Sequence, residues 1–161
     1  MADFVVYPDP RLNLSAVLLL EVGNELRATG ERLLEAAKAC KAHGLAAAHI
    51  GEIAPVVVID GGPAEYLLLF NPRVIAVADE REGGEEGSVS LPGVRVMVER
   101  PVWADVTFQT EAGAAETQRL TGFAARVALH EIDQMNGIFF LERVSRLKRE
   151  MALKKAKKHG G

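Results

Sequence analysis

The stretch that most constrains this chain is Leu129-His130-Glu131-Ile132-Asp133-Gln134-Met135-Asn136-Gly137. It ends a segment of helical periodicity that begins at Gly122, and Gly137 is a typical helix stop. His130 and Gln134 are four positions apart and therefore share one face of the helix. A histidine at the second position would complete a zinc-hydrolase pattern, in which two imidazoles hold the metal and a glutamate acts as general base. Because residue 134 is a glutamine, the central question is which residues of this chain could still bind a metal.

The bulk properties are those of an ordinary soluble globular protein. The chain has 161 residues, of which 48% are hydrophobic and 25% charged, and we predict one domain spanning residues 1–161. A net charge of −3 argues against a nucleic-acid-binding surface over the whole molecule. The longest apolar runs, such as Ala16–Leu20 and Ala54–Ile59, are far shorter than the ~20 residues that cross a bilayer. Cys40 has no partner for an internal disulfide, and no secretory signal is visible. We therefore expect a cytoplasmic protein with no membrane partner.

The periodicity predicts an α+β fold made mostly of antiparallel strands between helices. A helix is expected from Asn24 to about His43, with Gly44 as its stop, and two more at Gly122–Asn136 and Arg143–Lys158. The expected strands are Pro55–Asp60, Tyr66–Phe70, Val74–Ala78, Gly93–Glu99, Val102–Gln109 and Glu116–Leu120. Gly61–Ala64 is expected to be a turn and Asp79–Glu86 an acidic loop.

Three motifs, the last of them part of the stretch above, follow one another along the chain. They are Gly44-Leu45-Ala46-Ala47-Ala48-His49-Ile50-Gly51, then Glu86-Gly87-Ser88-Val89-Ser90-Leu91-Pro92-Gly93, then His130-Glu131-Ile132-Asp133-Gln134. Together they resemble the peptide deformylase signatures G-x-G-L-A-A-x-Q, E-G-C-L-S and H-E-x-D-H. Pro8–Leu12 and Asn71-Pro72 also resemble family segments, so the resemblance covers nearly the whole chain. It implies antiparallel sheets around a central motif-bearing helix, with N-terminal and C-terminal helices.

The resemblance also implies a chemistry and assigns roles to residues. The family removes the formyl group from N-terminal formyl-methionine, using a divalent metal, iron or zinc, held by one cysteine and two histidines. The corresponding metal positions are Ser88, His130 and Gln134. The catalytic positions are Glu131, which moves the proton, with His49 and the backbone N–H of Val89 at the oxyanion site. The implied substrate-binding residues are Gly44, Leu45, Glu86, Gly87, Arg95 and Arg100.

This chain departs from the family pattern at the metal ligands themselves. Ser88 replaces the cysteine, Gln134 replaces the second histidine, and His49 replaces the oxyanion glutamine. A neutral hydroxyl and an amide oxygen bind iron or zinc far more weakly than a thiolate and an imidazole. Catalytic zinc sites normally keep three protein ligands. We therefore predict a degenerate metal site and little or no deformylase turnover. The protein would instead bind N-terminal peptide segments in the old pocket or occupy the family's site on the ribosome.

Two interpretations of the exchanged residues stay open at this point. In one, His49 and His130 form a rearranged, weak metal site, helped by Ser88, Glu131 or water, with Gln134 as oxyanion donor. The protein would then be a metal-dependent amidase with an altered ligand set. In the other, these positions drifted after selection on the chemistry ended, and the protein binds no metal.

The C-terminal helix is basic on an otherwise acidic protein. Its cations are Arg143, Arg146, Lys148, Arg149, Lys154, Lys155, Lys157 and Lys158. Cations near a helix C-terminus interact favourably with the helix dipole, so one interpretation is a solvated helix end. The resemblance offers a second interpretation, in which the helix contacts ribosomal RNA through its phosphates.

Overall fold

The computed structural model describes residues 3–61 and 65–159. The helices are α1 (Asn24–Cys40), α2 (Gly122–Met135) and α3 (Arg146–His159), with short 3₁₀ turns at Pro10–Asn13, Ala47–Ile50 and Phe140–Arg143. The strands are β1 (Gly44–Ala46), β2 (Val56–Asp60), β3 (Tyr66–Val77), β4 (Arg81–Ser88), β5 (Leu91–Pro101), β6 (Trp103–Gln109) and β7 (Ala115–Thr121).

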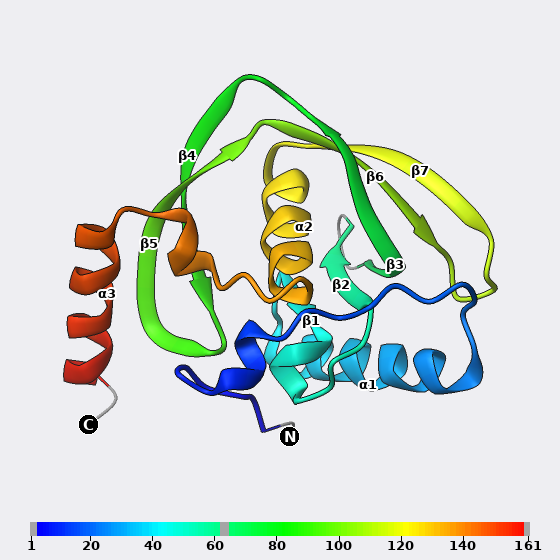
Figure 1. Cartoon of the computed structure of the whole chain (residues 1–161), viewed down its shortest axis with the longest axis horizontal. Coiled ribbons are helices and arrows are strands. Elements are labelled where there is room, and N and C mark those ends of the chain that lie inside the picture. Colours follow the sequence, from blue (N-terminus) through cyan, green and yellow to red (C-terminus); the bar gives the residue numbers. More distant parts are fainter. Residues whose placement is uncertain (1–2, 62–64, 160–161) are drawn as a thin grey trace.

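All the strand pairs are antiparallel and form two sheets. The larger sheet has five strands in the order β1-β2-β3-β6-β7, and the smaller one pairs β4 with β5. Figure 1 shows α2 in the centre, with β4 and β5 on one side of it and the larger sheet on the other. This arrangement confirms the expected α+β class with a central motif-bearing helix.

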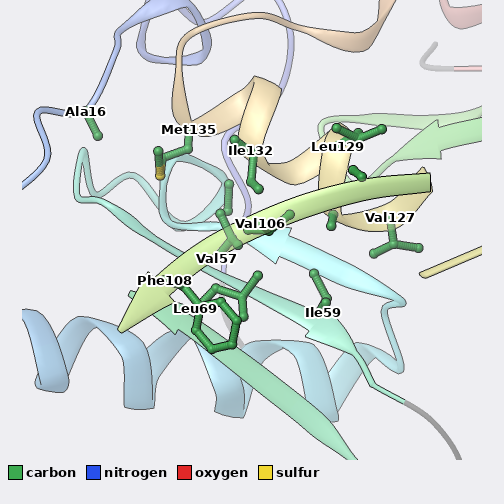
Figure 2. Packing of buried hydrophobic residues seen from close by; sticks show 13 residues of the cluster. Ala16, Val57, Ile59, Leu69, Val106, Phe108, Val127, Leu129, Ile132 and Met135 are labelled. Carbon is green, nitrogen blue, oxygen red and sulfur yellow. The ribbon is translucent and has the colours of Figure 1, made fainter. Parts of the chain in front are cut away.

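The main hydrophobic core lies between α2 and the larger sheet. Alternating residues of the sheet face the helix, among them Val57 on β2 and Val106 on β6, both fully buried. Ile132 and Met135 of α2 pack against them (Figure 2). Burying such side chains stabilises the fold by about 1.5–3 kcal/mol each. The core therefore fixes the rotation of α2, and with it the direction in which His130 points.

The two other helices pack in hydrophobic clusters of their own. α1 packs Leu33 and Ala37, both fully buried, in a cluster that also contains Val56 of β2. α3 buries Ala152 in a separate cluster that contains Val94 of β5. Figure 1 shows α3 running beside β5, at the edge of the molecule. α3 is thus attached to the smaller sheet and lies apart from the main core.

The end of the first helix and the start of the third differ from the sequence-based expectations, each for a local reason. Lys41 and not Gly44 ends α1, because its left-handed backbone at φ 54° turns the chain so that the Ala42 N–H also reaches the Ala37 carbonyl. Gly44 instead begins β1. The third helix starts three residues late, at Arg146, because Ser145 caps it: its Oγ accepts from the backbone N–H of Lys148.

The acidic stretch expected to be a loop is also structured. Residues from Arg81 to Ser88 form β4, which pairs with β5 from Pro101 down to Leu91. Periodicity missed this strand because Glu86 is its only buried residue and two glycines occupy its middle. β3 is likewise one strand where two were expected. It continues through Asn71, which has a φ of 49°, and its register with β6 shifts there.

The expected turn Gly61–Ala64 lies largely outside the described residues. In the described part of the chain, no helix combines the length and apolar character needed to cross a membrane.

Candidate functional site

A cavity of about 1090 Å³ brings the three motifs together. Motif one reaches it from β1 and the following 3₁₀ turn, motif two from the end of β4, and motif three from α2. The residues singled out in the sequence that line it are Gly44, Leu45, His49, Glu86, Gly87, Ser88, Val89, Arg95, His130 and Glu131. Arg100 and Gln134 were also singled out, but they are not among the lining residues.

Gly44 has a packing role that explains why a glycine stands there. A Cβ at this position would lie 2.6 Å from Val127 Cγ1 and 3.0 Å from Glu131 Cγ. The absence of a side chain therefore lets β1 approach α2 closely. This contact places motif one directly against the helix that carries motif three.

His49 lies at the bottom of the cavity and is 1% exposed. Its Nδ1 accepts a hydrogen bond of 2.9 Å from the backbone N–H of Ala46. Because Nδ1 is the acceptor, the proton of the neutral ring resides on Nε2. Nε2 is buried and has no hydrogen-bond partner among the described residues. Burial, helped by the neighbouring His130, lowers the His49 pKa to about 3, so the ring is neutral near pH 7.

Glu131 stands beside His49, with its Oε1 3.7 Å from His49 Nδ1. This distance is too long for a hydrogen bond, and Oε1 has no partner within the described part of the chain. Burial raises the Glu131 pKa to about 7 against the opposing attraction of His130. The cavity floor thus holds two buried polar atoms, His49 Nε2 and Glu131 Oε1, that no described residue pairs with.

The His130 ring is held in place by the carboxylate of Glu86. Its Nδ1 lies 2.7 Å from Glu86 Oε1, and its ring packs on Phe140 with centroids 5.4 Å apart. Burial opposes charge on His130, but Glu131 and Glu86 outweigh it and raise the pKa. A carboxylate behind a histidine is the usual support for a metal-ligating imidazole. His130 is therefore the one ligand position that keeps the geometry expected of it.

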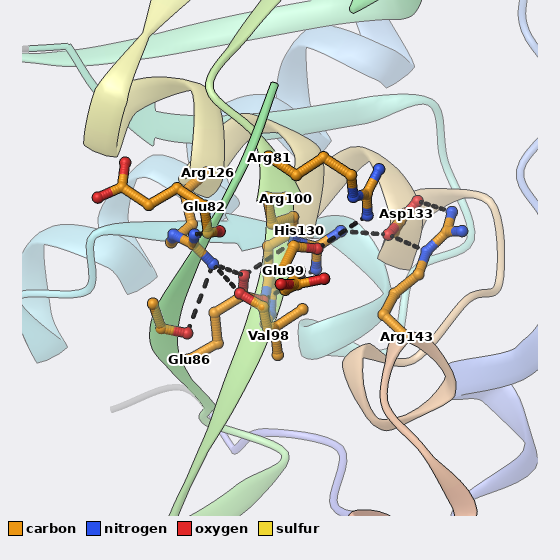
Figure 3. A network of polar contacts seen from close by, with 11 residues as sticks. Arg81, Glu82, Glu86, Val98, Glu99, Arg100, Arg126, His130, Asp133 and Arg143 are labelled. Carbon is orange, nitrogen blue, oxygen red and sulfur yellow. Dashed lines mark hydrogen bonds and ion pairs between the residues drawn. The ribbon is translucent and has the colours of Figure 1, made fainter. Parts of the chain in front are cut away.

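Glu86 is also the centre of a buried ion network (Figure 3). Arg100 donates to both of its carboxylate oxygens, at 2.8 and 2.9 Å, and Arg126 donates to Oε2 at 2.9 Å. Burial opposes ionisation of Glu86, but the hydrogen bonds from Arg100 and His130 hold its pKa well below the usual range. The carboxylate is therefore charged at neutral pH and fully paired.

Arg100 faces away from the main cavity. Its second ion partner is Asp133 at 2.6 Å, and Arg143 binds the same carboxylate at 2.8 Å. Arg100 lines a second, smaller cavity of about 450 Å³. The expected substrate contact would require this guanidinium to leave the buried Glu86 and the partly buried Asp133. Arg95, in contrast, is exposed and lines the main cavity.

The other two ligand positions are engaged with the protein. Gln134 is 1% exposed, and its Nε2 donates to the Leu12 carbonyl at 2.7 Å. It thereby anchors the N-terminal 3₁₀ turn to α2. Ser88 Oγ accepts from the backbone N–H of Ser90 at 3.0 Å. Within residues 3–61 and 65–159, no three or more His, Cys, Asp or Glu side chains form a group that could hold a metal.

Several residues at the cavity escaped the sequence reasoning. Arg126 lines it and binds Glu86, and its position four residues before His130 on the helix could have indicated this. Lys41 at the end of α1 lines the cavity, as do Lys155 and Lys158 of α3. Nothing local in the sequence indicates that these three lysines surround one cavity.

The fold and the convergence of three motifs on one cavity define a deformylase-type α+β protein. The chain matches the family model for polypeptide deformylase over residues 1–150 and belongs to that family.

Relatives of two kinds share this similarity. A peptide deformylase-like protein of Rhizobium meliloti (strain 1021) is 39% identical over 94% of this chain and 89% of its own length. A second, from Agrobacterium fabrum, is 38% identical over 98% of each chain. The same Agrobacterium strain has a protein named peptide deformylase that is 34% identical over 94% of this chain and 91% of its own.

Solved structures agree with the fold. The crystal structure of peptide deformylase from Ehrlichia chaffeensis matches with a TM-score of 0.91 at 26% identity, covering 99% of this chain and 97% of that one. A Synechococcus elongatus peptide deformylase in complex with actinonin matches with a TM-score of 0.89 at 33% identity, covering 97% and 88% of the two chains.

Proposed function

We propose that this protein binds N-terminal peptide segments in the motif-lined cavity and hydrolyses formyl-methionine weakly or not at all. The observation that carries the proposal is the state of His49. Its unpartnered ring nitrogen, Nε2, carries the proton of the neutral ring, whereas the rearranged metal site would need a lone pair on that nitrogen. We also propose that the protein works in the cytoplasm.

The hydrogen bond from Ala46 decides what His49 can do. A histidine binds a metal through an unprotonated ring nitrogen. For Nε2 to be that nitrogen, the neutral ring would have to carry its proton on Nδ1, where it would meet the Ala46 N–H 2.9 Å away. Metal binding by His49 would therefore break the turn that positions it. This argues against the alternative of an active amidase with His49 and His130 as ligands.

The residues at the family's ligand positions do not fit iron or zinc either. Ser88 offers a neutral hydroxyl that already accepts from Ser90, and the Gln134 amide is bound to Leu12. His130 alone keeps an imidazole with a supporting carboxylate. Since catalytic sites of this kind use three protein ligands, one imidazole supports no resident metal. This supports a degenerate site.

The same floor remains suited to binding. His49 Nε2–H can donate to a carbonyl oxygen, and Glu131 can accept from an N–H or, when protonated, donate. A formyl or other amide group at a peptide N-terminus offers both partners. Leaving such buried groups unpaired costs about 1–3 kcal/mol each, which a bound peptide would recover.

The relatives fit a separation of roles. Agrobacterium fabrum has one protein named peptide deformylase-like and another named peptide deformylase, and both resemble this chain. A chain with an altered floor beside a separate deformylase is what we would expect if binding replaced turnover.

The first test measures formate release from a formyl-methionyl peptide, with added Fe²⁺, Ni²⁺, Co²⁺ or Zn²⁺. We expect at most trace release from the unaltered protein and clear activity after Ser88→Cys, Gln134→His and His49→Gln are combined. Metal content measured on the same samples should rise only in the combined variant. Turnover by the unaltered protein that matches the combined variant would overturn the proposal.

The second test measures binding to a fluorescent N-terminal peptide. His49→Asn keeps an acceptor for the Ala46 N–H but removes the N–H of Nε2, so affinity should fall about tenfold with little change in stability. His43→Asn is the matched control, because His43 lines the cavity from an exposed position. Equal affinities for the two variants would remove His49 from the proposed role.

A further inference from the structure

The main cavity is surrounded by cations that come from three separate elements. Lys41 follows α1, Arg95 lies on β5, and Lys155 and Lys158 lie on α3. All four are exposed, and no ion pair joins them to an acid within the described part of the chain. Their charges are therefore available to a ligand.

The acids near the cavity do not cancel these cations. Glu86 is already neutralised by Arg100 and Arg126, and Glu131 lies in the floor. Glu85 is the remaining acid among the described lining residues. The cavity mouth is thus cationic on a chain whose net charge is −3. A concave surface of one sign focuses the electrostatic field on an oppositely charged ligand.

The packing of α3 explains why two of its lysines take part. Ala152 is buried against the cluster that includes β5, and Ala156 packs beside it. This contact turns Lys155 and Lys158, three positions apart on one helix face, toward the cavity. Lys154 and Lys157 are equally exposed but are not among the lining residues.

We propose that the cavity selects N-terminal peptide segments with acidic side chains shortly after their first residue, held by Lys41, Arg95, Lys155 and Lys158. The inference rests on the proposed function, that the cavity binds peptide N-termini. The first residue enters toward His49 and Glu131, and the following side chains meet the cations at the mouth.

The surroundings favour a peptide over RNA as the anionic partner. The cations encircle a cavity, whereas a nucleic-acid backbone is usually followed by a groove or an extended face. Single-stranded RNA is also held by aromatic stacking platforms. Phe123 is the aromatic side chain among the described lining residues, and its ring is already in edge contact with His43.

The test compares three fluorescent peptides that begin with formyl-methionine and continue with two aspartates, two serines or two lysines. Anisotropy at low and moderate salt should rank them in that order, with the acidic peptide about tenfold tighter than the serine peptide and more salt-sensitive. The double variant Lys155→Glu with Lys158→Glu should abolish the preference. Lys154→Glu with Lys157→Glu changes the charge equally and should retain it. Arg95→Gln, on a different element, should weaken it.

The outcomes separate the two proposals. If no peptide binds, the proposed function fails. If all three bind equally well, the cavity binds peptides but the acidic selection is wrong. Equal losses in the two lysine pairs would mean a general charge effect and would overturn the inference. So would tighter binding of a single-stranded RNA oligonucleotide that depends on Lys155 and Lys158.

Discussion

Glu131 and Asp133 lie two residues apart on α2, yet their carboxyl groups have opposite surroundings. Asp133 is bound by Arg100 and Arg143 in the network that continues to Glu86. Glu131 lies on the cavity floor beside a neutral His49, with one oxygen unpartnered among the described residues. On the side of α2 that faces the ion network, the charged groups are paired. On the side that faces the cavity, polar atoms lack a partner among the described residues.

The difference indicates which part of the site holds the fold and which part meets a ligand. Buried charges are tolerated when they are paired, and breaking such a pair is strongly destabilising. Buried polar atoms without a partner are uncommon and indicate a binding or catalytic role. The altered positions Ser88 and His49 belong to the cavity side, whereas Glu86 and Arg100 keep the network intact.

The largest expected effect comes from breaking the network. Glu86→Gln removes the charge that pairs with Arg100 and Arg126 and leaves the buried Arg100 half-paired. The free energy of unfolding should fall by about 3–5 kcal/mol, measured by urea denaturation. Arg146→Gln, which removes an exposed pair with Glu150, is the control and should cost less than about 1 kcal/mol. Similar losses in the two variants would mean that the network has no special structural weight.

Removing the carboxyl group of Glu131 on the cavity floor should, in contrast, raise the free energy of unfolding at high pH. The folded pKa of Glu131, about 7, lies above the ordinary value of 4.5. The protein is therefore favoured while Glu131 is protonated and loses that stability as pH rises from about 4.5 through 7. Glu131→Gln cannot ionise, so it should be more stable than the unaltered protein at pH 8, by about 2–3 kcal/mol more than at pH 5.

The pH dependence must be measured as a difference between the two proteins. The depressed pKa of His49, about 3, acts in the other direction and removes stability as pH falls below about 6.5. Both proteins keep His49, so its contribution cancels in the comparison. A stability difference that does not change between pH 5 and pH 8 would contradict the assignment of Glu131.

A smaller effect should distinguish Gln134 from His49. Gln134→Leu removes the donor to the buried Leu12 carbonyl and should cost about 1–2 kcal/mol of stability. Peptide affinity should stay unchanged, because Gln134 does not line the cavity. Gln118→Leu, on the exposed β7 strand, controls for the chemical change. Loss of peptide binding in the Gln134 variant would place its amide in the ligand site after all.

The sequence predicted those features of the fold and site that depend on residues close together in the chain. The pattern of His130, Glu131 and the glycine-bounded motifs was enough to indicate the family, which the comparisons confirm. The hydrophobic periodicity of α1 and α2 located these helices closely. β4 was missed because it has no apolar alternation of its own. Its pairing with β5 is what makes it a strand.

The sequence by itself determined the family, the α+β class and the departure at Ser88, Gln134 and His49, because each depends on residue identity at fixed spacing. Only the tertiary structure decided what the exchanged residues do. Gln134 reaches the Leu12 carbonyl because the chain folds back on itself, and the His49 ring accepts from Ala46 within a single 3₁₀ turn. The side chain at residue 134 was expected at the metal. It instead binds a carbonyl 122 positions away in the chain.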